Sequence, residues 1–361
     1  MKKQVVANPA RKRLKLVGAS ALMLLLSACG DHPPKDDKKD DKPPPVQAAI
    51  SIVAGSATES GSRDATGTSA RFDRPSGITI DTAGNLYVAD RDNNTIRKIT
   101  PAGVVTTLAG SVDAREIIDG VGGAARFLDP NAITIDSSGT LFVTDYLHIR
   151  SVGTGGQVNI VATLPTGTGD GRNTGALVPQ GVAVDKRGNL YATNRYGTRR
   201  ISGTATTILE GINAPSNAFG TLGAPARGIA VDGSDNVYVA TIQNTIARTN
   251  GSTTLSHLAG TANVTGSADG TGSGASFGQV VALTVDPQGN VYAADDTNYL
   301  IRKITPAGVV TTVAGTRGST TLGTGALPGS LASLGGIVTD GKGNLYATSG
   351  HAVIKIVLPQ Q

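Results

Sequence analysis

One sequence phrase recurs six times, and this repetition limits the chain to folds built from copies of one unit. Each copy has branched apolar residues alternating with small ones, then an Asp, a short Gly- and Asn-rich stretch and a second apolar stretch with Tyr or Phe. The copies occupy residues 77–90, 132–145, 181–194, 228–241, 282–295 and 336–349. Their aspartates, which lie 47 to 55 positions apart, are Asp81, Asp136, Asp185, Asp232, Asp286 and Asp340. This period exceeds that of leucine-rich or helical repeats, so we assign the excess to loops.

The first copy predicts four short strands joined by tight turns. Residues 77–80 alternate as a strand does, and 81–85 (DTAGN) supply Asp, Gly and Asn for a turn. The next three strands are expected at 86–89, 95–99 and 104–109. Four strands joined by hairpins form one blade of a propeller, and the abundance of Gly (48 residues) with branched residues favours an all-β chain.

The two ends of the chain complement each other. The sixth copy ends after its third strand, at 352–358, whereas residues 49–55 (AISIVAG) match the fourth-strand phrase at 310–315 (VTTVAG). We therefore predict an all-β, six-bladed β-propeller of four-stranded antiparallel blades. The N-terminal strand completes the last blade and removes an exposed sheet edge.

The repeat resembles NHL repeats, and the loop phrase at 119–130 is similar to that of bacterial NHL propeller lipoproteins. The resemblance covers about residues 48 to 358. It implies the propeller fold but says little about function, because such propellers serve many tasks.

The first 28 residues have the pattern of a cleaved export signal. A basic segment precedes an apolar run at 16–26, which is too short to span a membrane. The run leads into Leu-Ser-Ala-Cys at 26–29, which matches the bacterial lipobox, and Cys29 is the only cysteine. The resemblance to lipoproteins implies that Cys29 is lipidated and that, with Gly30 following it, the protein is sorted to the outer membrane. The alternative is an ordinary export signal with an incidental cysteine.

Residues 29–45 are predicted to be a disordered tether, because 30–45 mix Pro, Asp and Lys without branched or aromatic apolar residues. The propeller is then expected to span 46–361. Six of the 32 basic residues precede residue 29, which leaves 26 basic against 27 acidic residues. A mature chain this close to neutral lacks the charge of a nucleic-acid binder, so nucleic acid is excluded as a partner.

Candidate binding residues lie on the face formed by the inter-blade loops and the turns between second and third strands. The turn residues on this face are Arg91, Asp92 and Asn93; Tyr146 and His148; Arg195 and Tyr196; Gln243 and Asn244; Asp296 and Asn298; and His351. The inner strands are expected to start at the channel mouth with Ser76, Asn131, Gln180, Arg227, Val281 and Gly335. The polar members of this ring, Ser76, Asn131, Gln180 and Arg227, are also candidates for ligand binding.

Several conspicuous side chains have simpler structural interpretations. Arg71 and Arg126 are expected to pair with loop carboxylates, and the repeat aspartates to form turns. The phenylalanines expected to fill gaps between blades are Phe72, Phe127, Phe219 and Phe277. The Asp-Gly pairs that begin at Asp119, Asp170 and Asp269 are expected to form local turns rather than calcium loops, since they lack a dense series of acidic ligands.

Metal-dependent lactonases and lyases among six-bladed propellers hold their metal with acidic, amide or histidine side chains at the starts of inner strands. Here those starts include no carboxylate or imidazole. His257 is expected in an outer strand, and His148 and His351 in equivalent turns. If His148 and His351 faced the same opening, they could together bind a metal or act in acid–base chemistry, which is a weaker hypothesis than their structural role in turns.

Two functional interpretations follow. The first is a non-catalytic binding or scaffold propeller, monomeric and lipid-anchored through Cys29 to the cell envelope, that binds a protein, glycan or small ligand without a cofactor. The alternative is a hydrolase or lyase of the lactonase-like group, with calcium or zinc held by loop residues. Stoichiometric metal in the purified protein would favour the alternative.

Overall fold

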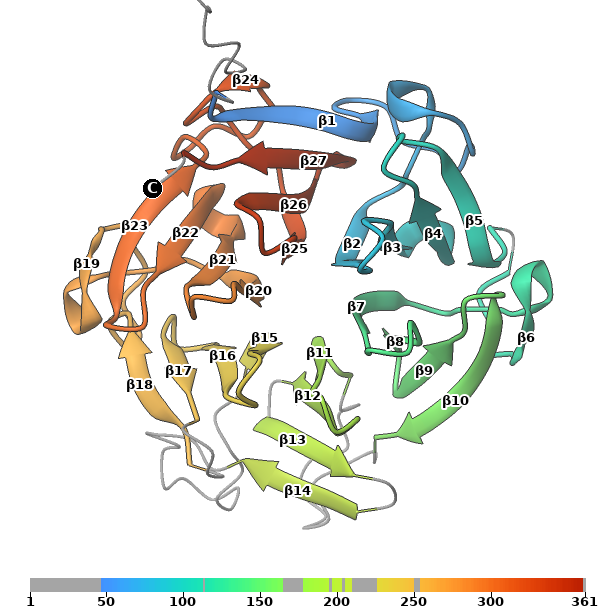
Figure 1. Ribbon diagram of the computed structural model, residues 1–361, viewed down its shortest axis with the longest axis horizontal. Coiled ribbons are helices and arrows are strands. Elements are labelled where there is room, and N and C mark those ends of the chain that lie inside the picture. Colours follow the sequence, from blue (N-terminus) through green and yellow to red (C-terminus); the bar gives the residue numbers. More distant parts are fainter. Residues whose placement is uncertain are drawn as a thin grey trace, which may run out of the picture. The chain divides into compact units, whose positions relative to one another are not determined.

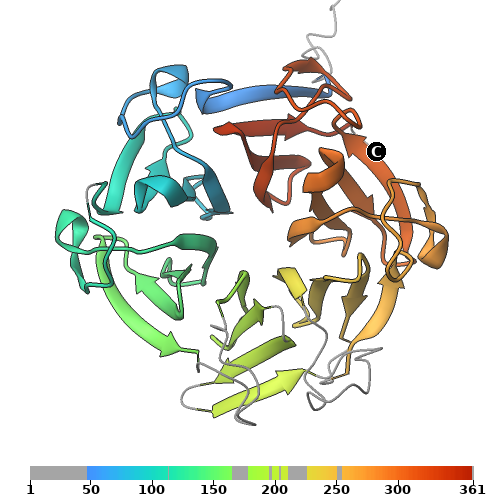
Figure 2. The ribbon, with the colours of Figure 1, turned by 180° about the vertical axis from the view of Figure 1, so that it is seen from behind.

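The computed structural model describes residues 47–112, 114–164, 178–194, 197–202, 205–209, 226–249 and 254–359. The described strands form six antiparallel sheets arranged in a ring, so the predicted six-bladed propeller is confirmed (Figures 1 and 2). The predicted export signal, Cys29 and the tether lie outside the described residues. Within the described part, no helix has the length and apolar character needed to cross a membrane.

Each blade begins with its inner strand at the channel and ends at the rim. Blade 1 consists of β2 (Pro75–Ile80), β3 (Leu86–Asp90), β4 (Thr95–Ile99) and β5 (Val105–Gly110). Blade 2 consists of β7 (Pro130–Ile135), β8 (Leu141–Asp145), β9 (His148–Val152) and β10 (Gln157–Thr163). Blade 3 consists of β11 (Gly181–Val184), β12 (Leu190–Asn194), β13 (Gly197–Ser202) and β14 (Ala205–Leu209).

The second half of the ring repeats this order. Blade 4 consists of β15 (Ala226–Val231), β16 (Val237–Thr241), β17 (Ile246–Arg248) and β18 (Ser256–Ala259). Blade 5 consists of β20 (Val280–Val285), β21 (Val291–Asp295), β22 (Leu300–Ile304) and β23 (Val309–Ala314). Blade 6 contains β25 (Leu334–Thr339), β26 (Asn344–Ser349) and β27 (His351–Val357). The described connections also contain five 3-10 turns: η1 (Gly67–Ser69), η2 (Arg91–Asn93), η3 (Gly122–Ala124), η4 (Gly272–Gly274) and η5 (Asp296–Asn298).

The N-terminal strand closes the ring, as predicted. Strand β1 (Ala49–Ser56) pairs antiparallel with β27, with Ser51 opposite Lys355 and Ser56 opposite His351 (Figure 1). The last blade therefore combines strands from both ends of the propeller.

Blades 2, 5 and 6 differ from the four-stranded prediction because each gains a two-residue fifth strand at the rim. These are β6 (Gly120–Val121) on β10, β19 (Gly270–Thr271) on β23 and β24 (Gly325–Ala326) on β1. All three come from the inter-blade loops. They cover the outer sheet edges with backbone hydrogen bonds.

The repeat Asp fixes the turn between the first and second strands, as predicted. Asp81 Oδ1 accepts the amides of Ala83 (2.9 Å) and Asn85 (2.8 Å), while Oδ2 accepts Asn85 Nδ2 (2.8 Å) and the Tyr87 hydroxyl (3.1 Å). Burial alone would raise the pKa of Asp81, but these hydrogen bonds outweigh it and lower the pKa. The same arrangement recurs at Asp185, Asp232 and Asp286.

The apolar core is divided into clusters between neighbouring blades. Tyr87 of blade 1, for example, packs with Ile133 and Val143 of blade 2, and Phe127 from the connecting loop is fully buried among them. Phe72 and Phe277 are equally buried, so three of the predicted gap-filling phenylalanines are confirmed. Phe219 lies outside the described residues.

In three of the described blades, a buried arginine binds two aspartates, which the sequence pattern did not predict. In blade 1, Arg97 bonds Asp90 at the end of β3 (2.5 Å) and Asp64 in the preceding loop (2.6 Å), and its guanidinium lies 4.9 Å from the centre of the Phe72 ring. Blade 2 repeats this with Arg150, Asp145, Asp119 and Phe127, and blade 5 with Arg302, Asp295, Asp269 and Phe277. Each arginine thereby joins the inter-blade loop to the interior of the blade.

This arrangement overturns one prediction. The carboxylates of Asp119 and Asp269 bind Arg150 and Arg302 and accept amides of the outer strands, rather than forming local turns. Asp170 lies outside the described residues. The sequence did not reveal these ion pairs, because Arg150 lies 31 positions from Asp119 and Arg302 lies 33 positions from Asp269.

Candidate functional site

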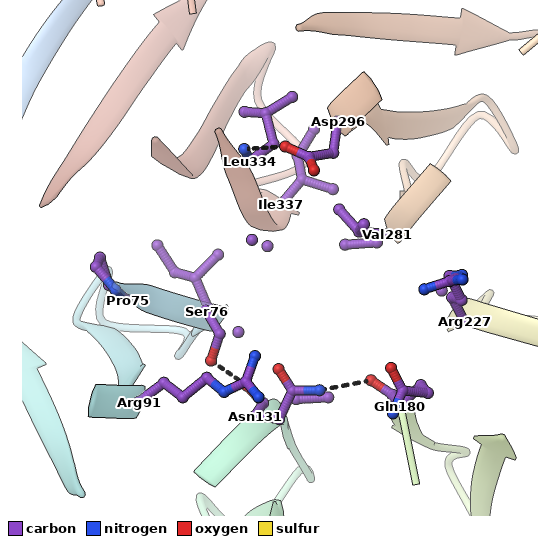
Figure 3. A pocket seen from close by; sticks show the side chains of 18 of the residues that line it. Pro75, Ser76, Arg91, Asn131, Gln180, Arg227, Val281, Asp296, Leu334 and Ile337 are labelled. Carbon is purple, nitrogen blue, oxygen red and sulfur yellow. Dashed lines mark hydrogen bonds between the residues drawn. The ribbon is translucent and has the colours of Figure 1, made fainter. Parts of the chain in front are cut away.

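A polar pocket of about 520 Å³ lies where the six inner strands begin. All six residues of the predicted channel-mouth ring line this pocket: Ser76, Asn131, Gln180, Arg227, Val281 and Gly335. Figure 3 labels all of them except Gly335. Each blade contributes one of these residues, because the repeat places the start of its inner strand at the same height in the ring. The volume is suitable for a small ligand.

The inner strands approach one another closely because the position after each ring residue is Gly or Ala. A Cβ atom added at Gly77 would lie 2.6 Å from the Asn131 carbonyl oxygen and 2.7 Å from the Ile133 nitrogen, both in the next blade. The corresponding positions of the other blades are Ala132, Gly181, Gly228, Ala282 and Gly336, and all of them line the pocket. Small residues therefore narrow the ring.

Ser76 and Asn131 join neighbouring blades through hydrogen bonds. The Ser76 hydroxyl donates to the Asn131 backbone carbonyl (2.8 Å), and Asn131 Nδ2 donates to the Gln180 backbone carbonyl (3.3 Å), as Figure 3 shows. Thr193 and Thr348 make equivalent links, donating to the carbonyls of Arg227 (2.6 Å) and Ser76 (2.7 Å). These contacts hold the pocket walls in place.

Gln180 and Arg227 differ from the other polar ring residues. Both side chains are half-buried, and neither has a hydrogen-bond or ion-pair partner among the described residues. They come from blades 3 and 4, and Figure 3 shows Arg227 across the pocket from Pro75 and Ser76. Of the ring residues, these two are therefore available to a ligand.

Three predicted loop-face residues reach the pocket, but each also holds the loop that enters the next blade. Arg91 Nε donates to Asp129 Oδ1 (2.7 Å), and Asp296 Oδ1 accepts the Leu334 amide (2.7 Å; Figure 3). His351 Nδ1 lies 3.4 Å from the Arg74 amide, which donates to it. Part of their role is therefore to connect blades.

The other predicted loop-face residues that the structure describes do not line this pocket. Asp92 pairs with Arg74 (3.1 Å), and Tyr146 is exposed with a φ of 52°. The Gln243 backbone carbonyl accepts a hydrogen bond from the Asn263 backbone amide (2.8 Å). Asn93 and Asn298 are buried and bind loop carbonyls, Asn244 binds Thr265, and Arg195 and Tyr196 lie outside the described residues.

His148 and His351 do not share one opening. His351 lines the pocket, whereas His148 Nδ1 contacts the Thr163 hydroxyl (2.9 Å) in blade 2 and is not part of the pocket wall. His257 lies in the outer strand β18, where Nε2 is 2.7 Å from the Gly260 carbonyl. In the part of the chain that the structure covers, no three His, Cys, Asp or Glu side chains gather as a metal site would require.

Two loop arginines were expected to pair with carboxylates. Arg71 does so, with Glu59. The Arg126 guanidinium instead donates to the carbonyls of Gly123 and Ala125, so that part of the prediction was wrong. The phrase Ala-Arg-Phe is shared by both loops, but a Glu at the matching position is not.

The pocket lining is richer in positive than in negative groups. Among the described residues it contains the guanidinium groups of Arg74, Arg91 and Arg227 against the single carboxylate of Asp296. Sequence reasoning missed Arg74, because nothing in the repeat phrase marks the residue before the inner strand.

Comparison with known proteins agrees with this architecture. The family model for the NHL repeat matches residues 72–99, which include β2, β3 and β4. No curated protein matches the chain. The chain is thus a six-bladed β-propeller that contains an NHL repeat.

Several solved structures share the fold. A structural genomics protein of unknown function from Bacteroides thetaiotaomicron is 20% identical, with a TM-score of 0.68 over 86% of this chain and 76% of that one. An auxiliary nutrient binding protein from the same organism is 17% identical, with a TM-score of 0.64 over 86% and 76%. A gluconolactonase from Xanthomonas campestris is 13% identical, with a TM-score of 0.55 over 86% and 90%. At these identities the likeness establishes the fold.

Proposed function

We propose that this chain is a non-catalytic binding propeller of the cell envelope, which holds a small polar ligand in the pocket at the channel mouth. One observation carries the proposal. All six blades place a residue around one pocket of about 520 Å³, and hydrogen bonds between blades hold its wall before any ligand arrives. A preformed wall lowers the entropic cost of binding.

The chemistry of the wall supports binding over catalysis. Ser76 and Asn131 are engaged between blades, and Asp296 Oδ1 and His351 Nδ1 each accept a backbone amide of a neighbouring loop, which supports a structural role for these groups. The auxiliary nutrient binding proteins from two Bacteroides species with this fold provide a precedent for a binding role.

The envelope location rests on the N-terminal sequence. The apolar run at 16–26, the lipobox at 26–29 and the Pro-, Asp- and Lys-rich residues 30–45 together support export and a lipid anchor on Cys29. Gly30 supports sorting to the outer membrane. Metabolic labelling with a radioactive fatty acid, compared between the natural chain and Cys29→Ser, tests the anchor.

Ligand binding is tested by obstructing the pocket. Val281 lines it without a polar role, so Val281→Trp fills the cavity, whereas Val309→Trp places the same side chain at an exposed site on β23. A library of envelope metabolites is screened by thermal shift. A compound that stabilises the natural chain and Val309→Trp but not Val281→Trp supports the proposal.

Two results would contradict the proposal. One is a ligand that binds Val281→Trp as tightly as the natural chain. The other is conversion of the bound compound to product, detected by mass spectrometry, together with stoichiometric calcium or zinc. That outcome would favour the hydrolase or lyase interpretation.

A further inference from the structure

Arg227 is the arginine of the pocket whose counter-ion the described residues do not provide. The other two pocket arginines are neutralised, Arg74 by Asp92 (3.1 Å) and Arg91 by Asp129 (2.7 Å). Arg227 lies in the wall of the same pocket, half-buried, and its side chain has no partner within the described part of the chain. Removing a guanidinium from water without a partner is unfavourable, so this position is poor for stability alone.

We infer that the ligand of this pocket carries an anionic group, a carboxylate or a phosphate, which is bound by the Arg227 guanidinium together with the Gln180 side-chain amide. The inference rests on the proposed function and names its ligand class. Arginine presents paired N–H donors that match the two oxygens of such a group. Gln180 adds a neutral donor from the adjacent blade, and its amide is likewise without a partner in the described residues.

Asp296 indicates what the rest of the ligand carries. Its Oδ1 accepts hydrogen bonds from the Leu334 amide (2.7 Å) and the Ser333 hydroxyl (3.2 Å), whereas its Oδ2 has no partner among the described residues. A carboxylate oxygen that faces a ligand accepts hydrogen bonds and repels anions. The ligand is therefore a small acid with hydroxyl groups, oriented with its acidic end at Arg227 and a hydroxyl at Asp296.

The test uses compounds that differ mainly in the acidic group. Titration calorimetry compares galacturonate with galactose, gluconate with sorbitol, and glucose 6-phosphate with glucose. At least one acid is expected to bind at least about tenfold more tightly than its neutral counterpart, as a charge-assisted hydrogen bond implies. Which pair responds distinguishes a carboxylate from a phosphate ligand.

Two variants distinguish a direct contact of Arg227 with the ligand from a general effect of losing one positive charge. Arg227→Gln is expected to lose the tenfold preference for the acid while still folding, since its side chain holds no other element. Arg187→Gln removes the same charge from an exposed site outside the pocket, where the side chain pairs loosely with Asp235 (3.5 Å), and is expected to keep the preference.

Failure of the inference is distinguishable from failure of the proposed function. If a neutral sugar binds as tightly as its acid, or Arg227→Gln keeps the preference, the anionic ligand is ruled out, although sensitivity to Val281→Trp would still support a binding pocket. If none of the three acids binds, the inferred ligand class is wrong. Binding that survives Val281→Trp contradicts both.

Discussion

At the scale of single residues, the buried arginines determine how loops attach to blades. Arg97 is fully buried with Asp90, and burial raises the pKa of Asp90 to about 6 while the Arg97 charge opposes that rise. The loop aspartate Asp64 is the exposed end of the same network. Equivalent groups are present in blades 2 and 5. Blade 4 has Thr241 and Ala247 at the two positions, so the repeat also accepts an uncharged pair there.

Arg97→Met should destabilise the propeller by about 3 to 5 kcal/mol, because it leaves the Asp90 carboxylate buried without its charge partner. Urea denaturation followed by circular dichroism measures the change. Arg187→Met is the matched control: it removes an exposed arginine, and we expect a change of less than about 1 kcal/mol. Equal losses in the two variants would contradict the assigned role of the buried pair.

The tyrosines of the second strands should make stability depend on alkaline pH. Burial, together with the negative charge of Asp81, raises the pKa of Tyr87 from 10 to about 12. Between these values the unfolded chain loses the phenolic proton before the folded chain does, so stability falls as pH rises from 10 to 12. Tyr87→Phe should reduce this fall, as measured by urea denaturation at several alkaline pH values. An unchanged pH dependence would show that Tyr87 titrates normally.

At the scale of strands, close packing of the inner strands should tolerate little added volume. Gly77→Ala places a methyl group 2.6 Å from the Asn131 carbonyl oxygen, so we expect a loss of about 1 to 3 kcal/mol. Gly155→Ala is the control, because its added Cβ meets open space and we expect a change within about 0.5 kcal/mol. Thermal unfolding compares the two, and a neutral Gly77→Ala would mean that the blades can separate at the channel.

Strand positions followed from local sequence pattern, whereas contacts between blades did not. The predicted third strand at 95–99 is β4 (Thr95–Ile99), because alternation and flanking turn residues are encoded within a few positions. The two-residue rim strand β6 (Gly120–Val121) was not predicted, since it forms by backbone pairing of a Gly-rich loop and leaves no side-chain pattern. Local rules therefore describe a blade better than its edges.

The same limit applies to the candidate site: its positions could be predicted from the sequence, but its contacts between blades could not. The repeat register predicted the channel-mouth ring, and the structure places its residues, including Arg227, around one pocket. It could not reveal that Arg91 is engaged by Asp129, because the partner lies 38 positions away in the next blade. It also gave no reason to separate Gln180 from Asn131, since only the structure shows which amide is already bonded.

At the scale of the whole molecule, the pairing of β1 with β27 should control global stability. Ser51 and Lys355 face each other across these strands, so Ser51→Cys with Lys355→Cys is expected to form a disulfide in the folded ring. Closing so long a loop restricts the unfolded chain and should stabilise the propeller by up to about 4 kcal/mol. Denaturation with and without reductant measures this in a Cys29→Ser background.

A second pair controls for cross-linking itself. Ser51→Cys with Lys303→Cys joins β1 to a position in blade 5, with which it does not pair, and should remain reduced. If both pairs oxidise equally, the closure by β1 is not specific. If the first pair oxidises without any gain in stability, ring closure does not limit unfolding.

Pairing of β1 with β27 also determines when the propeller can complete its assembly during synthesis. Strand β1 is among the first parts of the propeller to be synthesised and its partner β27 is the last, with about 300 residues between them. At common translation rates of about 5 to 20 residues per second, β1 waits roughly 15 to 60 s for its partner. The final blade is thus assembled only after β27 has been synthesised, and a nascent chain stalled short of residue 351 keeps β1 as a strand with an unsatisfied edge that chaperones must shield.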